Sequence, residues 1–187
     1  MGAFTISECP WMGCARVVYL CGILCAFEFL PEDWTGEVGI ILMHIEKVLE
    51  VTDEVCDVVQ QLIRQLGVDV PKYSKDDLTL LVNSGTSTLL IARHPDEKSP
   101  IVGMLTISLY RVPTGGRSIV EDLVVDENYR KLGIAKALML SAIQIAREAG
   151  ANGVALTSNF QRVEANQFYL ALGFQKRETN AYFYKLD

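Results

Sequence analysis

The chain has 187 residues, half of them apolar, and a formal net charge of −6. A chain of this length and composition can bury the core of one domain with an appendage, which argues against global disorder. The acidic balance argues against a general nucleic-acid binder, which needs a basic face, and it agrees with a cationic small substrate.

Most of the cysteines lie at the start of the chain. Their spacings match no zinc-binding pattern, and the histidines lie far from them in the sequence. We therefore expect no metal site, and a reduced, cytoplasmic protein. These cysteines are Cys9, Cys14, Cys21 and Cys25.

Residues 1–42 differ from the rest of the chain. The apolar run Val17–Phe27 is too short to span a bilayer. A secretory signal would require basic residues at the start of the chain, and none precedes Arg16. A membrane tether or signal segment is therefore the weaker interpretation. We interpret residues 1–42 as an N-terminal extension of uncertain order, with Met43 as a candidate natural start.

The first half of the remaining chain predicts a strand, two helices and three strands. The segment Met43–Leu49 reads as a strand, and helical patterns follow from Thr52 and from Ser74, each a capping residue. The three strands are separated by short turns rich in Gly, Pro, Asn and Ser, which predicts hairpins and a mixed sheet. They are Thr86–Ala92, Ile101–Val112 and Ser118–Val125.

The second half predicts helix, strand, helix and two last strands. An apolar stripe from Ala135 to Ala149 predicts an amphipathic helix packed on a sheet. The elements that follow are the strand Val154–Thr157, the helix Val163–Leu172 and the strands Phe174–Glu178 and Ala181–Leu186. We therefore treat residues 43–187 as one α/β domain.

The stretch Glu121–Ala149 carries the strongest functional signal. A β-branched strand ends in an acidic turn, and a glycine-containing turn, Arg130–Ala135, then opens the amphipathic helix. Backbone amides at a helix N-terminus and the positive end of the helix dipole together favour an anion. The alternative is an ordinary strand-to-helix turn.

Two motifs together resemble the GNAT superfamily of acyl-coenzyme A-dependent N-acyltransferases. The first has the form Arg130-x-x-Gly133-x-Ala135, with alanine where glycine is common, and the second is Ala165–Phe174. The resemblance spans Met43 to Asp187, so it makes residues 43–187 an N-acetyltransferase domain. It implies a GNAT-like α/β fold, with a mixed, mostly antiparallel central sheet flanked by about four helices.

The resemblance implies acetyl-coenzyme A (acetyl-CoA) as cosubstrate and no metal. The backbone of the glycine-containing turn would bind its pyrophosphate, and the preceding strand and one asparagine would hold its pantetheine arm. The turn residues are Arg130, Lys131, Leu132, Gly133, Ile134 and Ala135, and the pantetheine residues are Leu123, Val124, Val125 and Asn166.

The resemblance also implies two catalytic roles. Tyr169 is the candidate general acid at the thioester sulfur; the alternative is a half-buried core tyrosine. Glu121 is the candidate general base, directly or through water, with Asp122 as its rival. Strand alternation predicts that Glu121, Leu123 and Val125 share one face and Asp122 the other, although a bulge would upset this parity.

The predicted function is transfer of an acetyl group from acetyl-CoA to a primary amine by direct attack in a ternary complex. The acceptor could be a small metabolite amine, an amino acid or a polyamine. The alternatives are a protein lysine or N-terminal acetyltransferase, and a non-catalytic acyl-CoA-binding regulatory module. We expect no nucleic-acid or membrane partner, and a homodimer is common among similar proteins.

Overall fold

The computed structural model describes residues 6–7, 15–20, 24–29, 43–67 and 73–186. These residues form two compact units, one that ends at Leu156 and one that begins at Thr157, and each is described by itself. Cys9, Cys14 and Cys21 lie outside the described residues, so the expectation about their redox state stays a prediction.

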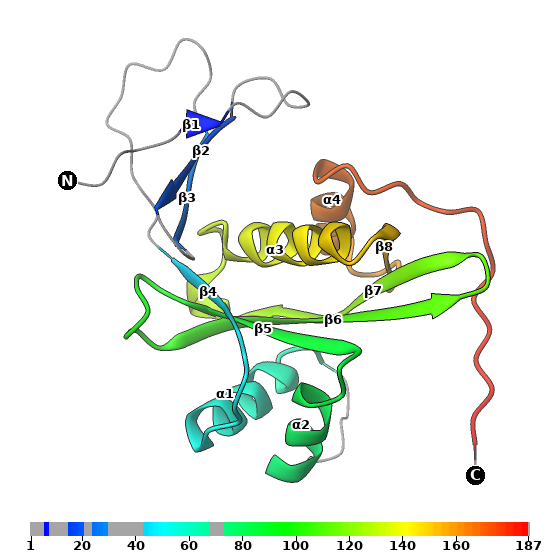
Figure 1. The fold of residues 1–187 in the computed structure, drawn as a ribbon, viewed down its shortest axis with the longest axis horizontal. Coiled ribbons are helices and arrows are strands. Elements are labelled where there is room, and N and C mark those ends of the chain that lie inside the picture. Colours follow the sequence, from blue (N-terminus) through cyan, green and yellow to red (C-terminus); the bar gives the residue numbers. More distant parts are fainter. Residues whose placement is uncertain (1–5, 8–14, 21–23, 30–42, 68–72, 187) are drawn as a thin grey trace. The chain divides into compact units, whose positions relative to one another are not determined.

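The first unit is built on one sheet whose strands are neighbours in the order in which they follow along the chain (Figure 1). Each strand is antiparallel to the next up to β7, and β8 runs parallel to β7. The predicted mixed, mostly antiparallel sheet is therefore confirmed. The strands are β1 (Ile6–Ser7), β2 (Ala15–Leu20), β3 (Leu24–Phe29), β4 (His44–Lys47), β5 (Ser87–Arg93), β6 (Ile101–Val112), β7 (Gly115–Val125) and β8 (Ala151–Leu156).

Helices cover both faces of this sheet. Figure 1 shows α1 (Asp53–Arg64) and α2 (Lys75–Val82) on one face and α3 (Ile134–Glu148) on the other. The crossover from β7 through α3 brings β8 back parallel to β7, which is the expected geometry for a strand–helix–strand connection.

The first two helices of the α/β domain begin directly after Thr52 and Ser74, the capping residues that predicted their starts. The Thr52 hydroxyl accepts a hydrogen bond from the Val55 amide at 3.2 Å. Ser74 and Asp77 form a reciprocal capping box, in which each side chain accepts from the other residue's backbone amide. Each cap satisfies amides that the helix itself leaves without partners.

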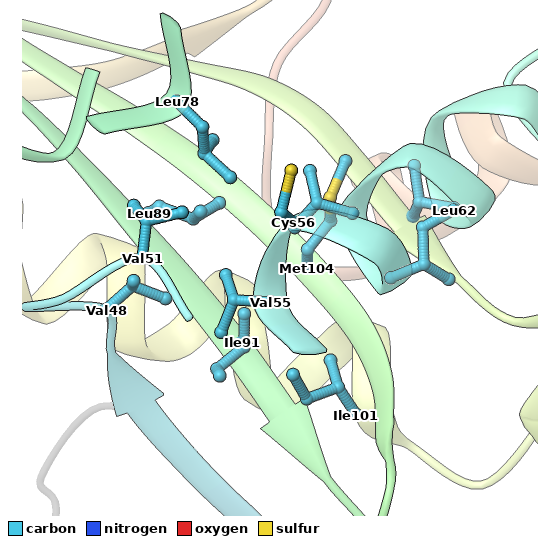
Figure 2. Close-up of a cluster of buried hydrophobic side chains, with 12 residues drawn as sticks. Val48, Val51, Val55, Cys56, Leu62, Leu78, Leu89, Ile91, Ile101 and Met104 are labelled. Atoms are coloured by element: carbon cyan, nitrogen blue, oxygen red, sulfur yellow. The ribbon is translucent and has the colours of Figure 1, made fainter. Parts of the chain in front are cut away.

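The core on the α1–α2 face is a cluster of buried side chains from the segment between β4 and α1, from α1 and α2, and from strands β5 to β7 (Figure 2). We call it the α1–α2 core. Its members are Val48, Val51, Val55, Cys56, Val59, Leu62, Leu78, Leu89, Ile91, Ile101, Met104 and Val124. Burying each large aliphatic side chain contributes about 1.5–3 kcal/mol, so this layer fixes α1 and α2 against the sheet.

The opposite face brings α3 unusually close to β6. A Cβ built on Gly103 would lie 3.2 Å from the Ile134 side chain and 3.3 Å from that of Leu138. The missing side chain at Gly103 therefore lets the first turn of α3 pack directly on the strand. This contact positions the N-terminus of α3 beside the end of β7.

The second unit contains α4 (Val163–Ala171) and an extended C-terminal segment. The two strands predicted at 174–178 and 181–186 are wrong, because residues 174–186 form neither helix nor strand. Tyr182 and Phe183 are 90% and 91% exposed. Alternation in a sequence cannot supply the partner strand that a β-strand needs, and none of the described strands pairs with this segment. None of the helices in the described part is long and apolar enough to cross a membrane.

Candidate active site at the end of β7 and the start of α3

A β-bulge interrupts β7 at the predicted acidic pair. Thr106 pairs with Glu121 and Met104 pairs with Val124, so Leu105 alone opposes two residues of β7. Asp122, one of these two, has φ +50°, a left-handed backbone that non-glycine residues rarely adopt. Bulges and such strained residues concentrate at functional sites.

The bulge overturns the predicted strand parity. Residues two apart on β6, Met104 and Thr106, share a face, so their partners Val124 and Glu121 share that face too. Met104 and Val124 belong to the α1–α2 core. Glu121 therefore lies on the face covered by α1 and α2, and not opposite Val124 as simple alternation predicted.

Both carboxyl groups at the bulge are poised to accept a proton. Partial burial raises the pKa of Asp122, and burial together with the neighbouring Asp122 charge raises the pKa of Glu121. Both residues nevertheless remain accessible at the surface. A carboxylate with a raised pKa is a stronger base than an ordinary one, so either residue can serve as the predicted base.

One edge of β7 is unpaired beyond the bulge. In the described chain, pairing with β8 ends at Val120 and Leu156. The Asp126 amide donates to the Val102 carbonyl of β6 at 2.9 Å, and alternation then turns the amides of Leu123 and Val125 to the opposite edge. These two amides are the donors that an extended ligand could meet there.

The turn after β7 is held by its own side chains and by α1. Asp126 caps the short 3₁₀ turn η1 (Glu127–Tyr129) by accepting from the Asn128 amide at 2.9 Å. Gln65, at the end of α1, donates to the Asp126 carboxylate at 3.1 Å and accepts from the Glu127 amide at 3.1 Å. Sequence analysis missed Gln65, because no local pattern marks a contact between residues so distant in the chain.

The N-terminus of α3 differs from those of α1 and α2. Gly133 occupies the N-cap with φ +75°, and no side chain caps the helix. Lys131 also has a positive φ, +65°. A Cβ on Gly133 would meet no protein atom within 4 Å. The glycine is therefore required by its backbone conformation, and the space beside it can accept a ligand.

This turn fits a pyrophosphate. Uncapped amides and the positive end of the α3 dipole favour an anion, and the Arg130 guanidinium, which donates to the Val125 carbonyl at 3.4 Å, adds positive charge nearby. The predicted turn residues from Arg130 to Ala135 and the strand residues from Leu123 to Val125 thus lie in one continuous stretch. Their contact with acetyl-CoA stays a prediction.

In the second unit, Asn166 and Tyr169 lie on the same side of α4. The Asn166 side-chain amide donates to the Asn159 carbonyl at 2.9 Å and so holds the preceding loop. The Tyr169 ring packs against Phe168 and Phe174, with centroids 5.4 and 6.0 Å away. Burial raises the pKa of Tyr169, so its hydroxyl keeps its proton at neutral pH. The roles assigned to both residues toward acetyl-CoA stay predictions.

Within the described chain, no group of His, Cys, Asp and Glu side chains could hold a metal ion.

The family model for the acetyltransferase (GNAT) family matches residues 57–174, more than half of the chain. The chain therefore belongs to the GNAT family, and the recognition based on the two motifs is confirmed. The enzyme class, acyltransferase, follows from this membership. The match includes both motifs and the whole of β7.

Two curated relatives and one solved structure show the range of similarity. N-acetyltransferase 8B from Rattus norvegicus is 35% identical over 85 residues, 44% of this chain and 37% of that protein. Glucosamine 6-phosphate N-acetyltransferase from Trypanosoma brucei brucei is 33% identical over 98 residues, 51% of this chain and 63% of that protein. The chain thus spans between about a third and two thirds of the length of the curated relatives it matches.

A solved aminoglycoside acetyltransferase from an uncultured soil metagenomic sample, in complex with sisomicin, has the same fold. It superimposes with a TM-score of 0.68 at 20% identity and covers 78% of this chain and 97% of that one. This likeness confirms the GNAT-like α/β architecture.

Proposed function

We propose that the chain transfers an acetyl group from acetyl-CoA to the primary amine of a small hydroxylated molecule, such as an amino sugar. The family supplies the acyl chemistry, and two similar proteins are named for amines of this kind, glucosamine 6-phosphate and aminoglycosides. The observation that carries the proposal is the continuity of the uncapped α3 N-terminus with the unpaired edge and carboxylates of β7.

The proposed mechanism begins with deprotonation of the amine. Free primary amines titrate near pH ~10, so a bound ammonium must lose a proton before it attacks. Glu121 or Asp122 accepts this proton, directly or through water, and their raised pKa values suit the task. The rate should fall as the pH drops through the raised pKa, because the protonated carboxyl can no longer act as base.

The next steps use backbone amides and a tyrosine. The amine nitrogen attacks the thioester carbonyl, and the amide of Leu123 or Val125 donates to the oxyanion that forms. The carbon–sulfur bond then breaks, and Tyr169 protonates the departing thiolate. Because a thiolate with a pKa near ~8.5 is already a fair leaving group, this last proton transfer assists turnover without being essential to it.

The test combines thermal stabilisation by acetyl-CoA with thiol release across a panel of amino sugars, polyamines, amino acids and lysine peptides. Acetyl-CoA at ~100 times its dissociation constant should stabilise the protein by about 2.7 kcal/mol, and amino sugars should give the fastest thiol release. Release with lysine peptides alone would make the protein a protein acetyltransferase. Stabilisation without thiol release would make the protein a regulatory module that binds acetyl-CoA. The absence of any stabilisation would exclude both acetyl transfer and the regulatory module.

A further inference from the structure

Tyr73, just before α2, has a buried hydroxyl whose position no hydrogen bond in the described structure explains. The residue is half-buried, but its hydroxyl oxygen is enclosed and has no hydrogen-bond partner among the described residues. Proteins satisfy nearly all buried polar groups, because an enclosed hydroxyl without a partner loses its hydration and gains nothing. Such an atom therefore needs an explanation.

The position of Tyr73 is fixed by its backbone and ring. The side-chain amide of Gln60 on α1 donates to the Tyr73 carbonyl at 3.1 Å. The Tyr73 side chain packs against the α1–α2 core, which includes Cys56 of α1 and Val124 of β7. The hydroxyl is thus carried to its place by contacts that do not involve it, and replacing it would leave these contacts intact.

The Tyr73 side chain lies on the same side of the sheet as Glu121. Glu121 shares the face of Val124. The negative charge of Asp122 contributes to the raised pKa of Tyr73. Burial first, then the charges of Cys56 and Asp122, raise the pKa of Tyr73 to about 12. The hydroxyl therefore stays neutral at working pH and can either donate or accept a hydrogen bond.

Two other enclosed polar atoms in the described chain lack partners. One is Nδ1 of His44 on β4, which β5 and β6 separate from β7, and the other is the Ser158 hydroxyl in the second unit. In the described part of the first unit, Tyr73 alone combines an unpartnered hydroxyl with a side chain that packs against the α1–α2 core, which includes Val124 of β7.

We infer that Tyr73 is a specificity-determining residue, whose hydroxyl binds a hydroxyl group of the acceptor next to the amine that the β7 carboxylates deprotonate. This rests on the acetyl transfer proposed above and narrows its acceptor to amines with a neighbouring hydroxyl. The acceptor hydroxyl supplies the missing partner in the complex. A site built to hydrogen-bond a hydroxyl discriminates strongly against an analogue that lacks it, because its own polar group is then left unpaired.

The test is a cycle of two proteins and two amines. Wild type and Tyr73→Phe are each assayed for thiol release with D-glucosamine and with 3-deoxy-D-glucosamine, so differences in amine basicity cancel. Wild type should prefer glucosamine in kcat/KM by about 10- to 100-fold, and Tyr73→Phe should reduce this preference to about threefold or less. The KM for acetyl-CoA should stay unchanged. Tyr110→Phe, at an exposed tyrosine on β6, is the matched control and should keep the full preference.

A stability measurement tests the premise separately. Removing an unpartnered hydroxyl should raise the Tm of the free protein by about 2–4 °C in Tyr73→Phe. A fall in Tm would mean that the hydroxyl already has a partner and would overturn the inference. An equal preference in wild type and Tyr73→Phe would overturn it as well, with the proposed acetyl transfer left standing. No thiol release by wild type with either amine would instead overturn the proposed function.

Discussion

Two regions of the first unit differ in how fully they satisfy their own backbone. In the α1–α2 layer, Thr52 and Ser74 cap the two helices, and the core beneath them is buried. In the stretch from Glu121 to Gly133, a bulge holds Asp122 at a positive φ. Among the described residues, one edge of β7 there has no partner strand and no side chain caps α3. Groups left unsatisfied within a stable scaffold are where a ligand gains most.

The largest expected effect comes from the carboxylates of this unsatisfied stretch. The double variant Glu121→Gln/Asp122→Asn should lower kcat/KM by about 100- to 10,000-fold, because no base remains for the amine. The measurement is thiol release against pH, in which wild type shows an acidic limb and the double variant loses it. The single variants show which carboxylate acts. Glu97→Gln, at an exposed loop position, is the control, and full activity in the double variant would remove the base role.

The next effect tests the uncapped helix start directly. Gly133→Asp puts a negative charge where the pyrophosphate should bind, and should weaken acetyl-CoA binding by about 100-fold through like-charge repulsion. Gly133→Asn is the matched control, because asparagine has the same shape, is neutral and tolerates a positive φ. Calorimetric titration with acetyl-CoA measures both. Equal affinity of the two variants would argue against an anion at this turn.

Tyr169→Phe should have a smaller effect. It should lower kcat by about 10- to 100-fold without weakening acetyl-CoA binding, because only the proton for the leaving thiolate is lost. The assay is single-turnover thiol release at saturating substrates, so that chemistry limits the rate. Tyr182→Phe, at an exposed tyrosine of the same unit, serves as control. Unchanged turnover in Tyr169→Phe would return this residue to a packing role.

In the α1–α2 layer, a substitution is expected to change stability alone. Thr52→Ala removes the α1 cap and should lower the free energy of unfolding by about 1 kcal/mol, with Tm about 2–4 °C lower. Thermal unfolding and kcat/KM are measured on the same sample. If kcat/KM fell as well, the two regions would not be as separate as their contacts indicate.

The smallest effect is a pH-dependent gain in stability. The pKa of Asp122 is raised in the folded chain above its ordinary value of 3.8, so the ionised form weakens the fold. This weakening is absent below the ordinary pKa and complete above the raised one. Asp122→Asn should therefore have a higher Tm than wild type at pH ~7, and the difference should disappear near pH ~3. A lower Tm for the variant at neutral pH would contradict the desolvated carboxylate.

Local chemistry made much of this fold predictable. Thr52 and Ser74 marked two helix starts because capping needs only neighbouring residues. Gly133 and its surroundings marked the α3 N-terminus, since a positive φ at a turn favours glycine. The strand β6 was predicted at its observed bounds, Ile101–Val112. The C-terminal strands failed because pairing requires a partner that a sequence does not show.

The sequence by itself determined the family, the order of elements from Met43 to α4 and the turn that an anion would occupy, because each depends on residues close together in the chain. Only the tertiary structure decided which face of β7 carries Glu121, since one unpaired residue at the bulge reverses the alternation. It also decided that Gln65 holds the turn and that the Tyr73 hydroxyl is enclosed without a partner among the described residues. These contacts join distant parts of the chain, and packing alone creates them.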